Sequence, residues 1–337
     1  MIAPALAPYP EDFLPPTPSR RLMVRSTDGV RLAVQIHDPG AGVPAAARTV
    51  VLVHGWTCST TFWVRVLHRL RPHLRVVVYD LRGHGRSDAV PDGGFTPDAL
   101  AADLAAVLAA VLGPSSSDGT DGTDGAGRVV VAGHSMGAMT LVAFAARYPR
   151  ELHRHVAAGL LASTGVEQLM GRMTVLPHLG LPSGRSSGRP SGRPSDSPRF
   201  EALARRTIGD PRALHRLPLR LARASLVRAT MSRTATPLER AFCTDIVLAC
   251  PQRTYEGFAE MLATLDLSAD LARLDAPVSV LVGTQDRLTP PWHARRMAAA
   301  LPHPLGLVEV PGAGHMTPLT APDAVAAVVR DLAARPA

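Results

Sequence analysis

Four short runs of aliphatic residues constrain the fold of this 337-residue chain more than any other feature. They are Val50 to Val53, Val76 to Tyr79, Val129 to Ala132 and Val278 to Val282. None of them alternates strictly between apolar and polar residues, which is the pattern of strands buried on both faces of a parallel sheet. Parallel strands need long crossover connections, and helical stretches separate these runs. The pattern predicts an α/β fold with a mostly parallel central sheet flanked by helices.

Other segments complete this predicted sheet. Arg21 to Ser26 and Val30 to His37 alternate around Asp28-Gly29, which indicates an antiparallel hairpin at its start. Further strands are predicted at Val156 to Leu161 and at Leu305 to Val310. The stretches long and periodic enough for crossover helices are Phe62 to Leu70, Pro97 to Leu112, Ala138 to Arg147 and Ala321 to Ala334.

The sequence pattern divides the chain into three predicted parts: an N-terminal arm, an α/β core and a lid. Residues 1–18 are rich in proline and are expected to form an extended arm. Residues 19–162 and 266–337 are expected to form the α/β core. Residues 163–265 are largely helical in pattern and lie between two predicted strands, so we expect a lid over the carboxyl edge of the sheet, where open α/β sheets bind ligands. Within this lid, the Ser-Gly-Arg-Pro repeats of 182–198 predict a flexible insert.

Composition bounds the class of protein. The chain is 46% hydrophobic and 19% charged, which is ordinary for a soluble protein and excludes full disorder. No run reaches the roughly 18 apolar residues of a membrane span, and the N-terminus lacks the pattern of a signal peptide, so we expect a cytoplasmic protein. Cys58, Cys243 and Cys250 are too few for a disulfide scaffold, and no cysteine or histidine spacing predicts a metal site.

The net charge of +8 is concentrated in one region. Residues 172–240 contain 14 arginines and four acidic residues, a balance of +10, which leaves −2 for the rest of the chain. A basic face spread over the whole fold would favour nucleic-acid binding, and this distribution does not. We therefore expect no nucleic-acid partner.

The motif Gly133-His134-Ser135-Met136-Gly137 lies between a predicted strand and a predicted helix. A G-x-S-x-G nucleophile elbow requires this context, because the sharp turn exposes the serine hydroxyl. The N–H of Met136, at the helix N-terminus, would then face a developing oxyanion. At the end of another strand, His54-Gly55-Trp56 could supply the N–H of Trp56 as the second donor.

An acid and a base follow two later strands. Asp286 comes shortly after the run that begins at Val278, and His315 follows the run that ends at Val310. The chain order Ser135, Asp286, His315 is that of an acyl-transfer triad. Asp286 is preferred to Asp266, Asp270 and Asp275, because only Asp286 follows its strand by the length of a loop.

These motifs together resemble the α/β-hydrolase superfamily, in its serine-nucleophile, lidded branch. The resemblance covers roughly residues 21–165 and 266–334, and includes the loop Tyr79 to Asp88. We interpret this loop as structural: Asp80, Arg82, Ser87 and Asp88 are expected to form a buried network that supports the oxyanion loop. His84 is expected to be a satisfied polar residue.

The resemblance implies a serine hydrolase that cleaves a small-molecule carboxylic ester through an acyl-enzyme. Ser135 would be the nucleophile, His315 the base, and Asp286 its orienting carboxylate, with no metal or organic cofactor. An acyltransferase, a thioesterase, a carbon-carbon bond hydrolase and a perhydrolase would use the same triad, and a non-catalytic ligand-binding member of the fold is a further alternative. The residues that suggest an apolar acyl pocket, or a lid packed on itself, are Leu169, Met170, Met173, Met231, Phe242, Phe258, Met261 and Leu262. Substrate identity and oligomeric state are left open.

Overall fold

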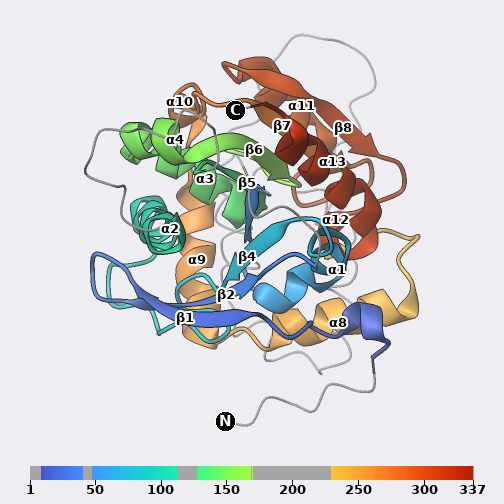
Figure 1. Ribbon diagram of the computed structural model, residues 1–337. Helices are drawn as coiled ribbons and strands as arrows, with labels where there is room; N and C mark the ends of the chain where they lie inside the picture. Colours follow the sequence, from blue (N-terminus) through green and yellow to red (C-terminus); the bar gives the residue numbers. More distant parts are fainter. Residues whose placement is uncertain (1–8, 41–47, 113–126, 168, 170–228, 337) are drawn as a thin grey trace.

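The computed structural model describes residues 9–40, 48–112, 127–167, 169 and 229–336. Within these residues an eight-stranded sheet lies between two layers of helices (Figure 1). The strand order is β1-β2-β4-β3-β5-β6-β7-β8. The strands are β1 (Arg20–Arg25), β2 (Arg31–His37), β3 (Thr49–Val53), β4 (Arg75–Tyr79), β5 (Val129–His134), β6 (Val156–Ala162), β7 (Val278–Gly283) and β8 (Pro304–Val310).

The strand pairing confirms the predicted sheet. The hairpin β1–β2 is antiparallel, β2 pairs antiparallel with β4, and every later pair is parallel. The four aliphatic runs fall within β3, β4, β5 and β7. Their side chains alternate between two hydrophobic cores: Val51 and Val53 face one core, while Val50 and Leu52 face the other. Burial on both faces explains why these strands carry no polar alternation.

The helices are divided between the two cores. The first core is covered by α2 (Pro97–Leu112), α3 (Met136–Arg147), α4 (Pro149–His155), α9 (Gln252–Thr264), α10 (Ser268–Leu271) and α11 (Pro291–Ala300). The second is covered by α1 (Val64–Leu70), α8 (Pro237–Leu248), α12 (Thr317–Thr320) and α13 (Pro322–Ala334), with the 3-10 turns η1 (Glu11–Phe13) and η2 (Thr60–Trp63). The predicted crossover helices are all present, and the α/β core has four additional described helices, α4, α10, α11 and α12.

Of the arm predicted over residues 1–18, the structure describes the segment 9–18. It contains the turn η1, and Figure 1 shows it beside α8. Tyr9 and Phe13 are buried, and both rings contact Phe242 of α8, with centroid distances of 5.0 and 5.1 Å. The aromatic residues, rather than the prolines, therefore determine how this segment packs.

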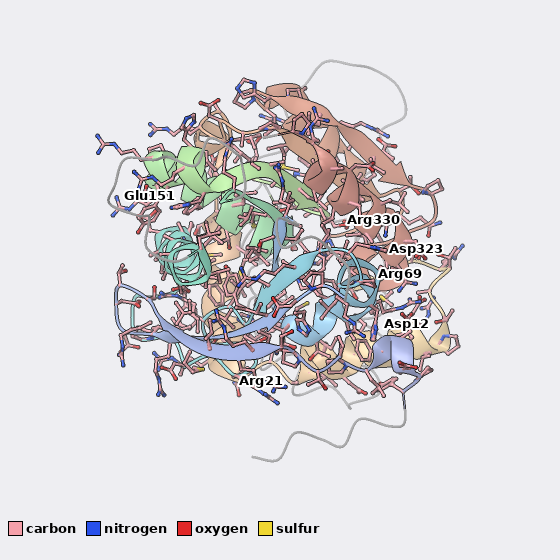
Figure 2. All side chains as sticks on the ribbon, in the orientation of Figure 1. Asp12, Arg21, Arg69, Glu151, Asp323 and Arg330 are labelled. Atoms are coloured by element: carbon pink, nitrogen blue, oxygen red, sulfur yellow. The ribbon has the colours of Figure 1, made fainter. Side chains whose placement is uncertain are left out.

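Charged side chains fix the same segment to the core. Asp12 accepts hydrogen bonds from Arg65 and from Arg69, at 2.6 and 2.9 Å. Arg69 also pairs with Asp323 of α13 at 2.5 Å, and Figure 2 shows these labelled side chains in one region of the surface. Arg65 donates in addition to Glu239 of α8, at 2.7 Å. The network joins the N-terminal segment, α1, α8 and α13.

The region predicted as a lid is described in part. Its described helices, α8 and α9, pack on different cores of the molecule. The predicted insert 182–198 lies outside the described residues, as do Met170 and Met173. The boundaries of the lid remain a prediction. Among the described helices none has the length and apolar character needed to cross a membrane.

Candidate active site

Ser135 occupies the sharp turn between β5 and α3. Its backbone has φ 52° and ψ −119°, a conformation that is unfavourable for a residue with a side chain. The turn is fixed by the Ser135 N–H, which donates to the carbonyl of Ala162 at 2.9 Å. A Cβ atom at Gly133 would overlap the backbone of Ala138, and one at Gly137 would overlap the backbone of Val53. Both glycines of the motif are therefore required by close backbone approach, as a nucleophile elbow demands.

Asp286 and His315 form a buried pair at the same edge of the sheet. His315 Nδ1 lies 2.9 Å from Asp286 Oδ2. The other carboxylate oxygen, Oδ1, accepts from the N–H groups of Leu288 and Thr289, each at 2.9 Å. The Thr289 hydroxyl donates to Oδ2 at 2.9 Å. Asp286 thus accepts hydrogen bonds on both oxygens, which fixes its orientation toward the imidazole.

The loops that carry this pair are bonded to each other. The N–H of Gln285 donates to the carbonyl of Ala313 at 2.8 Å, and the N–H of Gly312 donates to the Thr284 hydroxyl at 2.9 Å. The N–H of His315 donates to the carbonyl of Thr230 at 3.0 Å, so the chain just before α8 also supports the histidine loop. The other acids weighed from the sequence lie elsewhere: Asp266 bonds to Ser268, and Asp275 pairs with His303.

Ser135 and His315 are not directly hydrogen-bonded among the residues that the structure describes. Their segments are joined through His134, whose Nε2 lies 2.9 Å from the carbonyl oxygen of His315. The rings of His134 and His315 have centroids 5.0 Å apart. Complete burial holds the pKa of His134 well below its ordinary value, so this imidazole is neutral and donates through Nε2.

Of the two expected oxyanion donors, Met136 follows Ser135 within the elbow, and Trp56 lies in the loop after β3. Within the described part of the chain, neither the N–H of Trp56 nor that of Met136 donates a hydrogen bond. Gly55 brings the first of these loops against the serine, because a Cβ atom at Gly55 would lie 3.1 Å from the Ser135 Cβ. The role of these two N–H groups as oxyanion donors stays a prediction.

The loop after β4 forms the predicted network, with two corrections. Asp80 is buried and accepts from the N–H of Thr60 at 2.7 Å, which anchors the loop that follows Trp56. The Ser87 hydroxyl donates to the carbonyl of Asp80 at 2.5 Å. Arg82 is fully buried, but it pairs with Asp103 of α2 at 2.7 Å and so supports the helix rather than the oxyanion loop.

Asp88 is the second correction, because its side chain is 35% exposed and therefore not part of a buried network. It forms a surface pair with Arg31 at 2.9 Å, which joins the loop to β2. Burial raises the pKa of Asp80, and the N–H groups of Thr60 and Arg86 oppose that rise.

The apolar residues assigned to the lid do not form one surface. Met231 and Phe242 belong to the second core, where Phe242 packs against Tyr9 and Phe13. The other described members lie in the first core, and these are Leu169, Phe258, Met261 and Leu262. Packing of α8 on the N-terminal segment therefore accounts for Phe242 without an acyl pocket.

The described residues contain no group of three His, Cys, Asp or Glu side chains that could hold a metal ion. All three cysteines have free thiols, and burial raises the pKa of Cys243 and of Cys250 to about 12. At neutral pH these two thiols are protonated and weakly reactive.

Comparison with known proteins identifies the family. A sequence model of the alpha/beta hydrolase family matches residues 50–328, and the chain belongs to this family. This result confirms the predicted fold and the predicted hydrolase class. The putative carbamate hydrolase RutD of Caulobacter sp. (strain K31) is 26% identical over 293 residues, which cover 87% of this chain and 93% of that protein. The bifunctional esterase/perhydrolase DCH of Acinetobacter calcoaceticus is 27% identical over 278 residues, covering 82% and 88%.

Solved structures give the same result. A thermophilic esterase from Thermogutta terrifontis superposes with a TM-score of 0.67 at 25% identity, covering 93% of this chain and 97% of the esterase. The enol-lactonase from Burkholderia xenovorans LB400 shares the fold, with a TM-score of 0.67 at 22% identity and coverage of 94% and 100%.

Proposed function

We propose that this chain is a serine hydrolase that cleaves carboxylic esters through an acyl-enzyme on Ser135. The observation that carries the proposal is the buried Asp286–His315 pair, at 2.9 Å, on the sheet edge where Ser135 is held at φ 52°. A serine hydroxyl is a weak nucleophile unless a base removes its proton during attack. His315 is the base available for that step.

In the proposed mechanism Ser135 Oγ attacks the ester carbonyl carbon while His315 Nε2 takes its proton. The resulting oxyanion accepts hydrogen bonds from the N–H groups of Trp56 and Met136. Collapse of this intermediate breaks the bond to the alkoxide, which leaves as the alcohol with the proton from His315. Water then attacks the acyl-enzyme by the reverse sequence and releases the acid. Asp286 stays ionised and stabilises the imidazolium in both steps.

We further propose an apolar acyl group. Phe258, Met261 and Leu262 lie on one helix, α9, which packs over the loops that follow β3 and β4. A panel of p-nitrophenyl esters of graded acyl length tests this directly. We expect kcat/KM to rise with the length of the acyl group, because each methylene that becomes buried contributes about 0.8 kcal/mol. If kcat/KM stays constant or falls as the acyl group lengthens, the acyl group is not bound in an apolar pocket.

A second candidate activity is perhydrolysis, which is favoured by the similarity to the esterase/perhydrolase over 82% of the chain. In this reaction hydrogen peroxide replaces water, so that a new bond from peroxide oxygen to the acyl carbon displaces Ser135 Oγ, which recovers its proton from His315. The products are a peracid and free enzyme. Assay of peracid and acid from one ester, with and without peroxide, separates the two reactions.

Turnover of a p-nitrophenyl ester by the wild type and by Ser135→Ala tests the proposed function. We expect Ser135→Ala to lose about 10⁶-fold in kcat, which is the loss seen when a triad nucleophile is removed. A non-catalytic member of the fold would show no turnover in either protein. Equal turnover in both proteins would mean that another group performs the reaction.

A further inference from the structure

The turn after β3 has an unusual backbone. The N–H of Cys58 donates to the carbonyl of Gly55 at 3.2 Å, which closes a four-residue turn. Thr57, the third residue of this turn, has φ 65°. A closed turn with a positive φ at its third residue is a type II turn, and that position favours glycine. The peptide between Trp56 and Thr57 is the central peptide of the turn, and its orientation distinguishes type II from type I.

The turn is held in this form against the preference of its own sequence. A β-branched residue at positive φ costs about 1–3 kcal/mol, so surrounding groups must offset that cost. Two hydrogen bonds act on the central peptide. The Thr57 N–H donates to His84 Nε2 at 3.2 Å, and the Thr57 hydroxyl donates to the Trp56 carbonyl at 2.6 Å. The first of these bonds depends on a residue outside the turn.

His84 is built to accept that bond. Its Nδ1 lies 3.0 Å from the carbonyl of Arg82, which can only accept, so Nδ1 carries the proton and the lone pair of Nε2 is free for Thr57. The ring is 1% exposed and stacks on Phe258 of α9, with a centroid distance of 5.5 Å.

The ionisable groups that face His84 are His54 and Asp80. Burial, together with His54, lowers the pKa of His84 to about 3, although Asp80 opposes the shift. The imidazole is therefore neutral in the pH range of an esterase assay, and Nε2 remains an acceptor throughout it. The neighbouring His54 is engaged differently, because its Nε2 accepts from the N–H of Leu81 at 3.0 Å.

We propose that His84 is a positioning residue that holds this turn closed through the Thr57 N–H and thereby keeps the Gly55–Trp56 peptide, which carries the Trp56 N–H, beside Ser135. The inference rests on the proposed function, in which Trp56 is an oxyanion donor. Without the acceptor, Thr57 is no longer held at positive φ and the turn can open, which frees the Gly55–Trp56 peptide from its place beside Ser135. Helix α9 takes part in the same arrangement, since Phe258 stacks on His84 and Tyr255 contacts the Trp56 ring at 4.6 Å.

Two substitutions of His84 separate positioning from general stability. His84→Leu removes the acceptor and keeps an apolar contact for Phe258. His84→Gln retains an oxygen that can accept from the Thr57 N–H. We expect His84→Leu to lower kcat by about 10- to 100-fold with KM within about threefold, a smaller loss than the 10²–10³ for a deleted oxyanion donor. We expect His84→Gln to recover most of this loss. Equal loss in both variants, or a change in KM alone, would overturn the proposal.

Thr57→Gly distinguishes positioning of the turn by His84 from a general contribution of His84 to stability. Glycine adopts positive φ without a steric penalty, so the turn no longer needs His84 to hold it. In the His84→Leu background we expect Thr57→Gly to raise kcat by at least about threefold, and the same substitution in the wild-type background gives the reference effect from which the coupling of the two residues is calculated. Additive effects of the two substitutions on kcat would show that the residues do not act on the same peptide.

Nitrogen NMR of the wild-type protein, with ¹⁵N-labelled histidine, gives a readout that does not depend on activity. We expect His84 to be neutral with its proton on Nδ1 at pH 7. A proton on Nε2 would overturn the inference even if the enzyme is an esterase. If the expected tautomer is found and no ester is turned over by the wild type, the proposed function fails while the geometry of the turn stands.

Discussion

At the scale of single residues, the orientation of Asp286 is the best-determined feature of the site. Its two oxygens accept from Leu288, Thr289 and His315. A carboxylate held in this way can only present one lone-pair direction to the imidazole, and this determines which nitrogen of His315 carries the proton. In the proposed mechanism Asp286 therefore acts through the tautomer of His315 as well as through its charge.

We predict that Asp286→Asn lowers kcat by up to about 10⁴-fold while the protein stays folded, because an amide N–H facing Nδ1 favours the wrong tautomer of His315. Steady-state hydrolysis of a p-nitrophenyl ester measures the loss. Asp275→Asn is the matched control, since Asp275 pairs with the exposed His303 and should leave kcat unchanged. Near-native turnover by Asp286→Asn would place the acid elsewhere.

Sequence alone predicted these residues because each lies where a strand ends. Ser135 follows β5, and Asp286 and His315 follow β7 and β8. Thr289 was missed, although a threonine three residues after a buried aspartate is a local spacing that could have indicated the hydrogen bond. The contact of His84 with Thr57 joins residues 27 positions apart and has no local signal.

At the scale of elements, Arg65 joins parts of the chain that are distant in sequence. It donates to Asp12 at 2.6 Å, to Glu239 at 2.7 Å and to the carbonyl of Leu319 at 2.6 Å. Its side chain is 16% exposed, and that of Glu239 is 11% exposed. Arg65 thus connects the N-terminal segment to α8 and to the helix that follows His315.

We predict that Arg65→Met lowers the free energy of unfolding by about 2 kcal/mol, below the 3–5 kcal/mol of a fully buried pair because Asp12 is partly solvated. Urea unfolding measures this change. Arg295→Met removes an exposed pair with Glu309, which solvent screens, and should therefore have a clearly smaller effect than Arg65→Met. Equal effects of the two substitutions would show that Arg65 does not hold α8 in place.

An individual strand or helix could be predicted from the sequence where its apolar residues form a continuous run or recur at a regular spacing. The strands have continuous aliphatic runs, and α2 and α13 have long apolar patterns. Helix α4 buries only Leu152, so it has almost no periodic signal. The packing of Tyr9 and Phe13 was missed because their partner, Phe242, lies more than 220 residues further along the chain.

At the scale of the whole molecule, neutral buried histidines link stability to pH. The pKa of His84 is lowered to about 3, and its ordinary value is 6.5. Between these values the unfolded chain binds a proton that the native protein excludes. The contribution of neutral His84 to the free energy of unfolding is therefore fully present above pH 6.5 and is lost as the pH falls toward 3. His54, with its pKa lowered to about 4 by burial, acts in the same direction.

We predict that the free energy of unfolding falls more steeply on acidification in the wild type than in His84→Gln. Over pH 6 to 4 the difference in slope should approach about 1.4 kcal/mol per pH unit, which is the contribution of one excluded proton. Urea unfolding at fixed pH intervals gives both slopes. All other ionisable groups are the same in the two proteins, so the difference in slope reports His84 alone. Parallel slopes would mean that His84 is protonated in the native protein.

The central claim, that Ser135 is the nucleophile, is tested most directly by labelling with a fluorophosphonate and mapping the labelled peptide. Ser163 provides a matched control, because it also follows a strand and has a positive φ, of 47°, but its hydroxyl is bonded to Thr317. We predict one equivalent of label per chain, on the peptide that contains Ser135, retained in Ser163→Ala and absent in Ser135→Ala. Label that persists in Ser135→Ala, or that maps to another serine, would contradict the assignment.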